Sequence, residues 1–100
     1  MILFGNINKG IKEYGSTPGA LLVDVREADE FNNGHIPGAV NEPLSGIENT
    51  LLPKEMMLFL YCLRGTRSKR AAAILKKKGY KVKSIGGIKK YTGKIERQEP

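Results

Sequence analysis

The 100-residue chain has a single cysteine, Cys62, and a single histidine, His35. One cysteine cannot form a disulfide within the chain, and one cysteine with one histidine cannot supply the ligands of a Cys/His zinc site. We therefore expect neither a metal nor a cofactor. Any chemistry at Cys62 has to come from its own thiol.

Long apolar runs are also missing. The longest uncharged apolar run covers residues 56–63, whereas a helix needs ~20 residues to cross a bilayer, so no membrane partner is expected. The first residues have neither a basic start nor a small-residue cleavage site. No secretory signal is predicted, and the expected location is the cytoplasm. The length fits one domain over residues 1–100, without internal repeats or low-complexity tracts.

Positive charge is in excess and unevenly placed. Seventeen Lys and Arg stand against ten Asp and Glu, which gives a net charge of +7. Residues 1–50 hold three basic and seven acidic groups, or −4, while residues 51–100 hold fourteen basic and three acidic groups, or +11. Such a field favours small anions, an acidic protein or a nucleic acid. The run from Lys76 to Lys78 by itself is explained by the favourable C-terminal end of a helix.

Apolar segments alternate with helix-forming ones along the chain. Residues 20–25 and 56–61 are continuous apolar runs, which predicts two strands buried on both faces. Shorter strands are predicted at 39–41 and 80–85. Helices are predicted up to residue 15 and at 26–31, 44–52, 68–78 and 88–91, and the tail from residue 96 is expected to fray. This order indicates an α/β domain with a mainly parallel sheet.

Cys62 lies where the second buried strand is predicted to end, just before a predicted helix. In open parallel sheets, ligands bind beyond the carboxyl ends of the strands. Backbone N–H groups of such a loop and the start of the helix together stabilise an anion. Gly65 allows the loop to curl, and Arg64 and Arg67 add cations. The pattern predicts a nucleophilic Cys62; the alternative is a buried cysteine that only ends a core strand.

Four segments, in order, resemble the rhodanese (thiosulfate sulfurtransferase) family. Together the segments span almost the whole chain, in the order and spacing of that family. The occurrence of the first two segments together is highly specific for it. The segments are 22–27 (LVDVRE), 34–39 (GHIPGA), 61–68 (YCLRGTRS) and 86–88 (GGI). The resemblance implies a single rhodanese-like domain with a mainly parallel, five-stranded sheet flanked by helices on both faces.

The resemblance also implies a reaction. In that family the loop cysteine attacks the outer sulfur of a donor such as thiosulfate, holds it as a persulfide and passes it to a thiol or to cyanide. Carried over by position, Cys62 is the nucleophile, and Arg64 and Arg67 are candidates for the sulfonate end of the donor. The substrate-binding loop is then Leu63, Arg64, Gly65, Thr66 and Arg67.

Loop length separates related chemistries. Phosphatase and arsenate reductase relatives place five residues between Cys and Arg, whereas four stand between Cys62 and Arg67. A shorter loop makes a smaller pocket, which favours sulfur transfer over dephosphorylation.

Three residues outside the loop have two interpretations each. His35 is either a base for Cys62 or, as its turn-like surroundings favour, a structural residue whose ring nitrogen satisfies a backbone carbonyl. Asp24 and Arg26 either act on substrate or, as we expect, form an ion pair that braces the cysteine loop. Ser68 is expected to support the loop from behind.

The sequence therefore predicts a sulfurtransferase that forms a Cys62 persulfide. One alternative is a persulfide carrier for a protein partner such as an acidic acceptor or a tRNA-modifying enzyme. Another is a rhodanese-like binding module without catalysis, and a cysteine phosphatase is the least favoured. The expected donor is thiosulfate or a persulfide and the expected acceptor a thiol or cyanide, and no direct contact with nucleic acid is expected.

Overall fold

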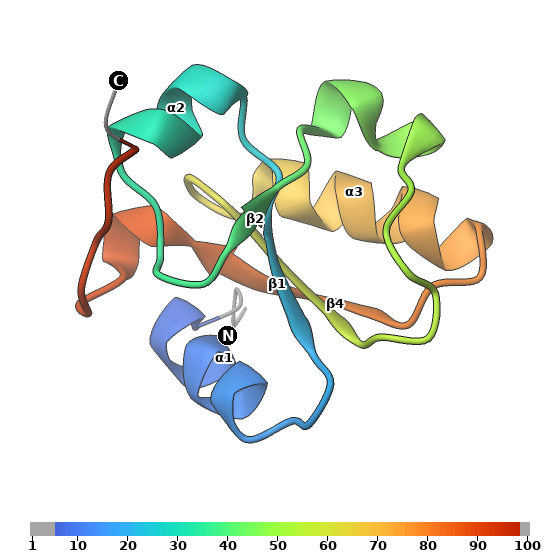
Figure 1. The fold of residues 1–100 in the computed structure, drawn as a ribbon, viewed down its shortest axis with the longest axis horizontal. Helices are drawn as coiled ribbons and strands as arrows, with labels where there is room; N and C mark the ends of the chain where they lie inside the picture. Colours follow the sequence, from blue (N-terminus) through green and yellow to red (C-terminus); the bar gives the residue numbers. More distant parts are fainter. Residues whose placement is uncertain (1–5, 99–100) are drawn as a thin grey trace, which may run out of the picture.

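The computed structural model describes residues 6–98 (Figure 1). Four strands form one parallel sheet in the order β2-β1-β3-β4. They are β1 (Leu21–Asp24), β2 (Val40–Asn41), β3 (Leu58–Cys62) and β4 (Val82–Gly87). The two strands predicted to be buried on both faces, β1 and β3, are the central pair, and every residue of β3 is buried. The predicted α/β class with a parallel sheet is confirmed.

The prediction of five strands is wrong for the described part of the chain, which holds four. Between residue 6 and β1 the chain forms the helix that was predicted to end at residue 15, α1 (Ile7–Gly15). Its start is fixed by Asn6, whose side-chain oxygen accepts hydrogen bonds from the backbone N–H groups of Asn8 and Lys9. No stretch is left there for another strand, and residues 1–5 lie outside the described chain.

Helices cover both faces of the sheet, as predicted. Figure 1 shows α1 on one side and α3 (Thr66–Lys77) on the other, where the 3₁₀ helix η1 (Leu44–Asn49) also packs. Two apolar clusters fill the layers between helices and sheet. One contains Leu60 and Leu75, and the other contains Ile7, Phe59 and Ile85. This two-sided burial holds β3 and its last residue, Cys62, in a fixed position.

Short elements complete the chain. α2 (Ala28–Asn33) follows β1, and the 3₁₀ helix η2 (Ile88–Lys90) follows β4. The helix predicted over 44–52 is a 3₁₀ helix that ends at Asn49. The tail does not fray at residues 96–98, because Glu96 and His35 exchange backbone hydrogen bonds of 2.8 Å.

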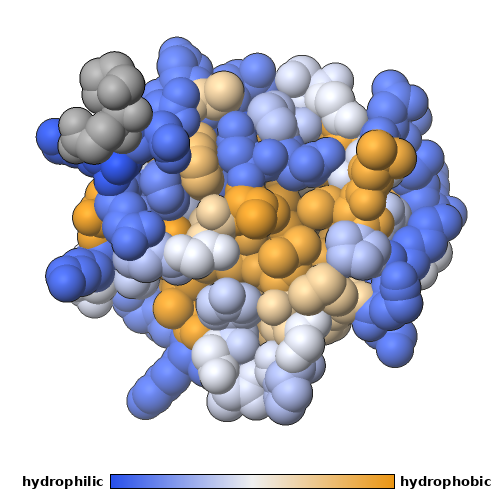
Figure 2. All heavy atoms as spheres, viewed as in Figure 1, coloured by the Kyte–Doolittle hydropathy of each residue, from blue (hydrophilic) through white to orange (hydrophobic). Residues whose placement is uncertain are grey.

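The surface is polar around an apolar centre in the view of Figure 2, where the apolar side chains lie over the β2 and β1 end of the sheet. β2 has only two residues, which pair with Val23 and Asp24 of β1. Among residues 6–98, no helix is long and apolar enough to span a membrane.

Candidate active site

The cysteine loop begins at the last residue of β3. Cys62 is 1% exposed, and three residues separate it from Thr66, the first residue of α3. β3 is central and parallel to both neighbours, so its carboxyl end faces the side of the sheet on which such folds bind ligands. The sheet therefore holds a single thiol at the end of β3, just before the start of a 12-residue helix.

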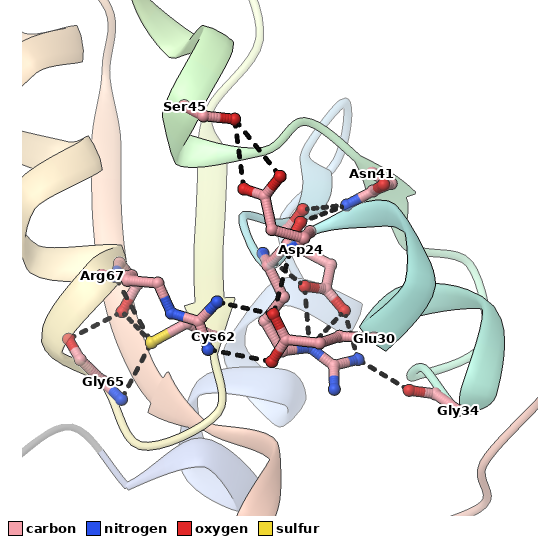
Figure 3. A network of polar contacts seen from close by, with 11 residues as sticks. Asp24, Glu30, Gly34, Asn41, Ser45, Cys62, Gly65 and Arg67 are labelled. Carbon is pink, nitrogen blue, oxygen red and sulfur yellow. Dashed lines mark hydrogen bonds and ion pairs between the residues drawn. The ribbon is translucent and has the colours of Figure 1, made fainter.

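Two backbone N–H groups point at the sulfur of Cys62. Gly65 N lies 3.0 Å from Sγ and Ser68 N lies 3.4 Å from it, while Ser68 Oγ lies 3.7 Å away (Figure 3). Backbone donors at a helix start stabilise an anion, and hydrogen bonds to an ionised acceptor are about twice as strong as neutral ones. The arrangement can hold a thiolate or a persulfide anion. The N–H groups that bind the sulfur belong to Gly65 and Ser68, so this anion site extends one residue beyond the predicted loop of residues 63–67.

The loop needs glycine at two positions. Gly65, which precedes α3, has φ of 108°, in the left-handed region that favours glycine. Gly87 of β4 lies directly against the loop: a Cβ built on it would come within 2.5 Å of Arg64 Cα. The backbone N–H of Lys89 also donates to Leu63 O at 3.1 Å. The end of β4 and the start of η2 thus support the cysteine loop, a role that the sequence signals only as a Gly-Gly pair.

Arg67 is held by an acidic partner that the sequence analysis missed. Its guanidinium donates two hydrogen bonds to the carboxylate of Glu30 in α2, at 2.7 and 3.0 Å (Figure 3). The hydrogen bond from Arg67 lowers the pKa of Glu30 despite partial burial, and the same bond raises the pKa of Arg67. The guanidinium therefore stays in place beside the loop. Only the acidic character of residues 27–30 hinted at such a partner.

The remaining loop side chains form the outer rim. Arg64 and Thr66 are exposed, and Leu63 is partly buried. The five predicted substrate-binding residues thus divide into an exposed rim, the Gly65 amide next to the sulfur, and a guanidinium paired with Glu30.

Asp24 and Arg26 form the predicted ion pair at the end of β1. Arg26 Nη2 lies 2.7 Å from Asp24 Oδ2, and both residues are buried. Burial acts to lower the pKa of Arg26, but the hydrogen bond and the charge of Asp24 outweigh it and raise that pKa. Arg26 also donates to Gly34 O at 2.6 Å and lies over the ring of Tyr61. The pair therefore joins the end of β1 to the turn after α2 and to β3, and braces the loop only through β3.

His35 has the structural role that its surroundings favoured. Its Nδ1 lies 2.9 Å from Phe31 O, and its ring stacks on that of Phe31. Its other nitrogen lies 3.9 Å from a carboxylate oxygen of Glu96. The interpretation of the ring as a partner of a backbone carbonyl is confirmed. Within residues 6–98, no three His, Cys, Asp or Glu side chains are grouped closely enough to hold a metal ion.

Comparison with known proteins agrees with this geometry. The family profile of the rhodanese-like domain matches residues 8–94. The chain belongs to the rhodanese-like family. The resemblance that the sequence analysis found on four segments is thus confirmed over almost the whole chain, and the cysteine loop occupies the middle of the matched region.

Rhodanese-like relatives include proteins with sulfur-transfer names. The chain is 45% identical over 83 residues to YqhL of Bacillus subtilis (strain 168), covering 77% of this chain and 64% of that protein. It is 37% identical over 79 residues to the same organism's putative sulfur carrier protein YrkF, covering 75% and 43%. It is 35% identical over 72 residues to the thiosulfate sulfurtransferase PspE of Escherichia coli (strain K12), covering 67% and 69%. The chain thus spans less than two thirds of the first two relatives.

Solved rhodanese-like structures share the fold. The BH2092 protein from Bacillus halodurans superposes with a TM-score of 0.74 at 34% identity, covering 89% of this chain and 72% of that one. A rhodanese with anions from E. coli gives a TM-score of 0.69 at 28% identity, covering 78% and 98%. Membership of this family supports sulfur transfer as the general chemistry of the chain.

Proposed function

We propose that this rhodanese-like domain is a thiosulfate sulfurtransferase in which Cys62 carries the transferred sulfur. The Cys62 thiolate attacks the outer sulfur of thiosulfate. A new S–S bond forms as the S–S bond of the donor breaks, and sulfite leaves with the electron pair. Cyanide or a thiolate then attacks the outer sulfur of the persulfide, and Cys62 leaves as the thiolate, ready for another cycle.

The observation that carries this proposal is the pair of amides on the sulfur. Gly65 N and Ser68 N lie 3.0 and 3.4 Å from Sγ, at the start of a helix. The sulfur is anionic before attack and again when the acceptor displaces it, so donors already oriented toward it stabilise both stages. A cysteine that merely ended a core strand would not need them. A lone reactive thiol also suits the reducing cytoplasm, where we place the activity.

The two arginines of the loop have different roles in this proposal. Arg67 is paired with Glu30, so its guanidinium is fixed beside the loop with its charge largely balanced by that carboxylate. Arg64 is exposed, so its guanidinium is free to turn toward the sulfonate oxygens of the donor. Asp24, Arg26 and Ser68 position the loop without reacting.

A second candidate keeps the persulfide and changes the acceptor. The basic half of the chain, with +11 over residues 51–100, contains the cysteine loop and favours an acidic protein. Relatives include a putative sulfur carrier protein, a tRNA sulfurtransferase and an adenylyltransferase and sulfurtransferase. In this version the domain receives sulfur as a persulfide and delivers it to a protein partner, and it has no direct contact with nucleic acid.

Turnover with small molecules tests the proposal. Wild-type protein, Cys62→Ser and an unrelated surface variant, Lys54→Ala, are compared for thiocyanate formation from thiosulfate and cyanide at equal folded concentration. We expect turnover in the wild type and in Lys54→Ala and none in Cys62→Ser. Turnover that persists without Cys62 refutes the proposal. A wild type that accepts sulfur only from a persulfide donor favours the carrier version.

A further inference from the structure

Ser84 of β4 lies in a line of polar atoms that begins at the sulfur of Cys62. Its Oγ is 2.7 Å from Ser68 Oγ, which lies 3.7 Å from Cys62 Sγ and 3.0 Å from Gly65 O. Ser68 is completely buried, whereas Ser84 is partly buried and lines a groove of about 360 Å³ between α3 and β4. The hydroxyl of Ser84 thus connects the solvent side of the groove to the buried sulfur through Ser68.

The single hydroxyl hydrogen of Ser68 determines whether Ser84 donates to Ser68 or accepts from it. Ser68 has one hydroxyl hydrogen and three polar neighbours. Gly65 O and an anionic sulfur can only accept, so both compete for that hydrogen. If Ser68 donated its hydroxyl hydrogen to Ser84, neither Gly65 O nor the sulfur would receive it. If Ser84 donates instead, the hydrogen of Ser68 remains available inside the site, and the donation strengthens the bond that Ser68 makes.

We propose that Ser84 is a positioning residue: it donates its hydroxyl hydrogen to Ser68, which keeps the Ser68 hydrogen for Gly65 O and the anionic sulfur of Cys62 and strengthens the hydrogen bond that Ser68 makes to them. This deepens the proposed function and rests on it only in taking the sulfur anion as the working form of Cys62. Without the Ser84 hydroxyl, the anion loses part of the stabilisation that Ser68 provides. The reactive anion then forms at a higher pH.

Other charges near the loop are the same with or without this hydroxyl. They are Arg64 in the loop, Arg67 of α3, Glu30 of α2, and Asp24 and Arg26 at the end of β1; Lys69 and Lys83 line the groove with Ser84. A matched pair of substitutions isolates the hydroxyl from all of them. Ser84→Thr keeps it and Ser84→Val replaces it with a methyl group of similar shape, and both side chains suit a strand.

The test measures the rate of Cys62 alkylation by iodoacetamide as a function of pH, read by intact mass. Cys62 is the only cysteine, so each adduct reports on it alone. We expect Ser84→Thr to resemble the wild type and Ser84→Val to move the midpoint of the rate profile upward by about 0.1 to 0.6 pH unit, because only the strengthening of the Ser68 hydrogen bond is lost and not the bond itself. In a Ser68→Ala background the two variants should coincide.

Two further outcomes separate this proposal from its neighbours. If Ser84→Val fails to fold, Ser84→Ala takes its place and should move the midpoint in the same direction; if Ser84→Thr fails to fold, the wild type is the hydroxyl-bearing reference. Coinciding profiles of folded Ser84→Val and Ser84→Thr would overturn the positioning role. Alkylation needs no sulfur donor, so a shifted profile in a protein that takes no sulfur from thiosulfate would refute only the proposed function.

Discussion

At the scale of single residues, the chain around Cys62 divides into groups that touch the sulfur and groups that hold those in place. Gly65 and Ser68 donate backbone hydrogen bonds to Sγ, and the Glu30–Arg67 pair lies beside them. Cys62, the loop and the Asp24–Arg26 pair were predictable because each is local in sequence. Glu30 and Arg67 are 37 positions apart and Ser68 and Ser84 are 16 apart, so their contacts depend on how elements pack.

A substitution at Arg64 tests the role of the exposed side chains of the cysteine loop. We expect Arg64→Ala to raise the KM for thiosulfate about tenfold while leaving the free energy of unfolding nearly unchanged, because an exposed guanidinium binds a sulfonate through charge-assisted hydrogen bonds. Steady-state kinetics and urea denaturation check the two parts. Arg70→Ala, which removes an exposed arginine from α3, is the matched control. Unchanged thiosulfate kinetics, or an unfolded domain, would assign Arg64 another role.

Glu30 gives a prediction about pH. The pKa of Glu30 is lowered from 4.5 in the folded protein by its hydrogen bond from Arg67. The pair therefore stabilises the fold fully above pH 4.5, and this contribution is lost as the pH falls through the folded-state pKa. Both side chains are about one-third exposed (32% and 31%), so Glu30→Gln should cost less than about 1 kcal/mol at pH 7.

Urea denaturation at pH 7 and at pH 3.5 measures this effect. The free energies of unfolding of the wild type and Glu30→Gln should differ at pH 7 and converge at pH 3.5. Glu55→Gln changes an exposed loop position and should have the free energy of unfolding of the wild type at both pH values. If the difference in the free energy of unfolding between wild type and Glu30→Gln grew as the pH fell, the ion pair would not stabilise the fold through the ionised Glu30.

At the scale of elements, β3 and α3 matter most, because the loop between them fixes where the sulfur lies. The buried strands were predictable from continuous apolar runs, and β1 and β3 are indeed the central pair. The start of α3 at Thr66, two residues before the prediction, follows from the left-handed Gly65 that precedes it. The close approach of Gly87 to the loop was not predictable, since it depends on the register of β4 beside β3.

Loop length gives a prediction at this scale. One Gly inserted between Gly65 and Thr66 restores the five-residue spacing of the phosphatase-like relatives and moves the amides away from the sulfur. Loss of one oriented donor costs about a hundredfold in rate, so sulfur transfer should fall at least that far, while slow hydrolysis of a small aryl phosphate should emerge.

Both activities are measured on both proteins at equal folded concentration. A Gly inserted between Pro18 and Gly19, in the turn before β1, controls for the insertion itself and should leave sulfur transfer unchanged. Efficient aryl phosphate hydrolysis by the wild type, or undiminished sulfur transfer after insertion in the loop, would show that loop length does not set the chemistry.

At the scale of the whole molecule, the parallel sheet and its two helical layers were predictable, while the number of strands was not. The fifth strand came from the family resemblance alone, and residues 6–98 hold four strands. The distribution of charge is also a property of the whole molecule. The half of the sequence that contains Cys62 has +11 against −4 for the other half, and an excess of positive charge of this kind favours anions.

Cys62 is expected to take up one sulfur atom and give it away, and intact mass spectrometry detects both steps. Wild-type protein incubated with thiosulfate should gain the mass of one sulfur atom, and cyanide or dithiothreitol should return it to its starting mass. Cys62→Ser should gain nothing under the same conditions. An adduct that forms without Cys62, or a wild type that gains no sulfur from either thiosulfate or a persulfide donor, would contradict the account.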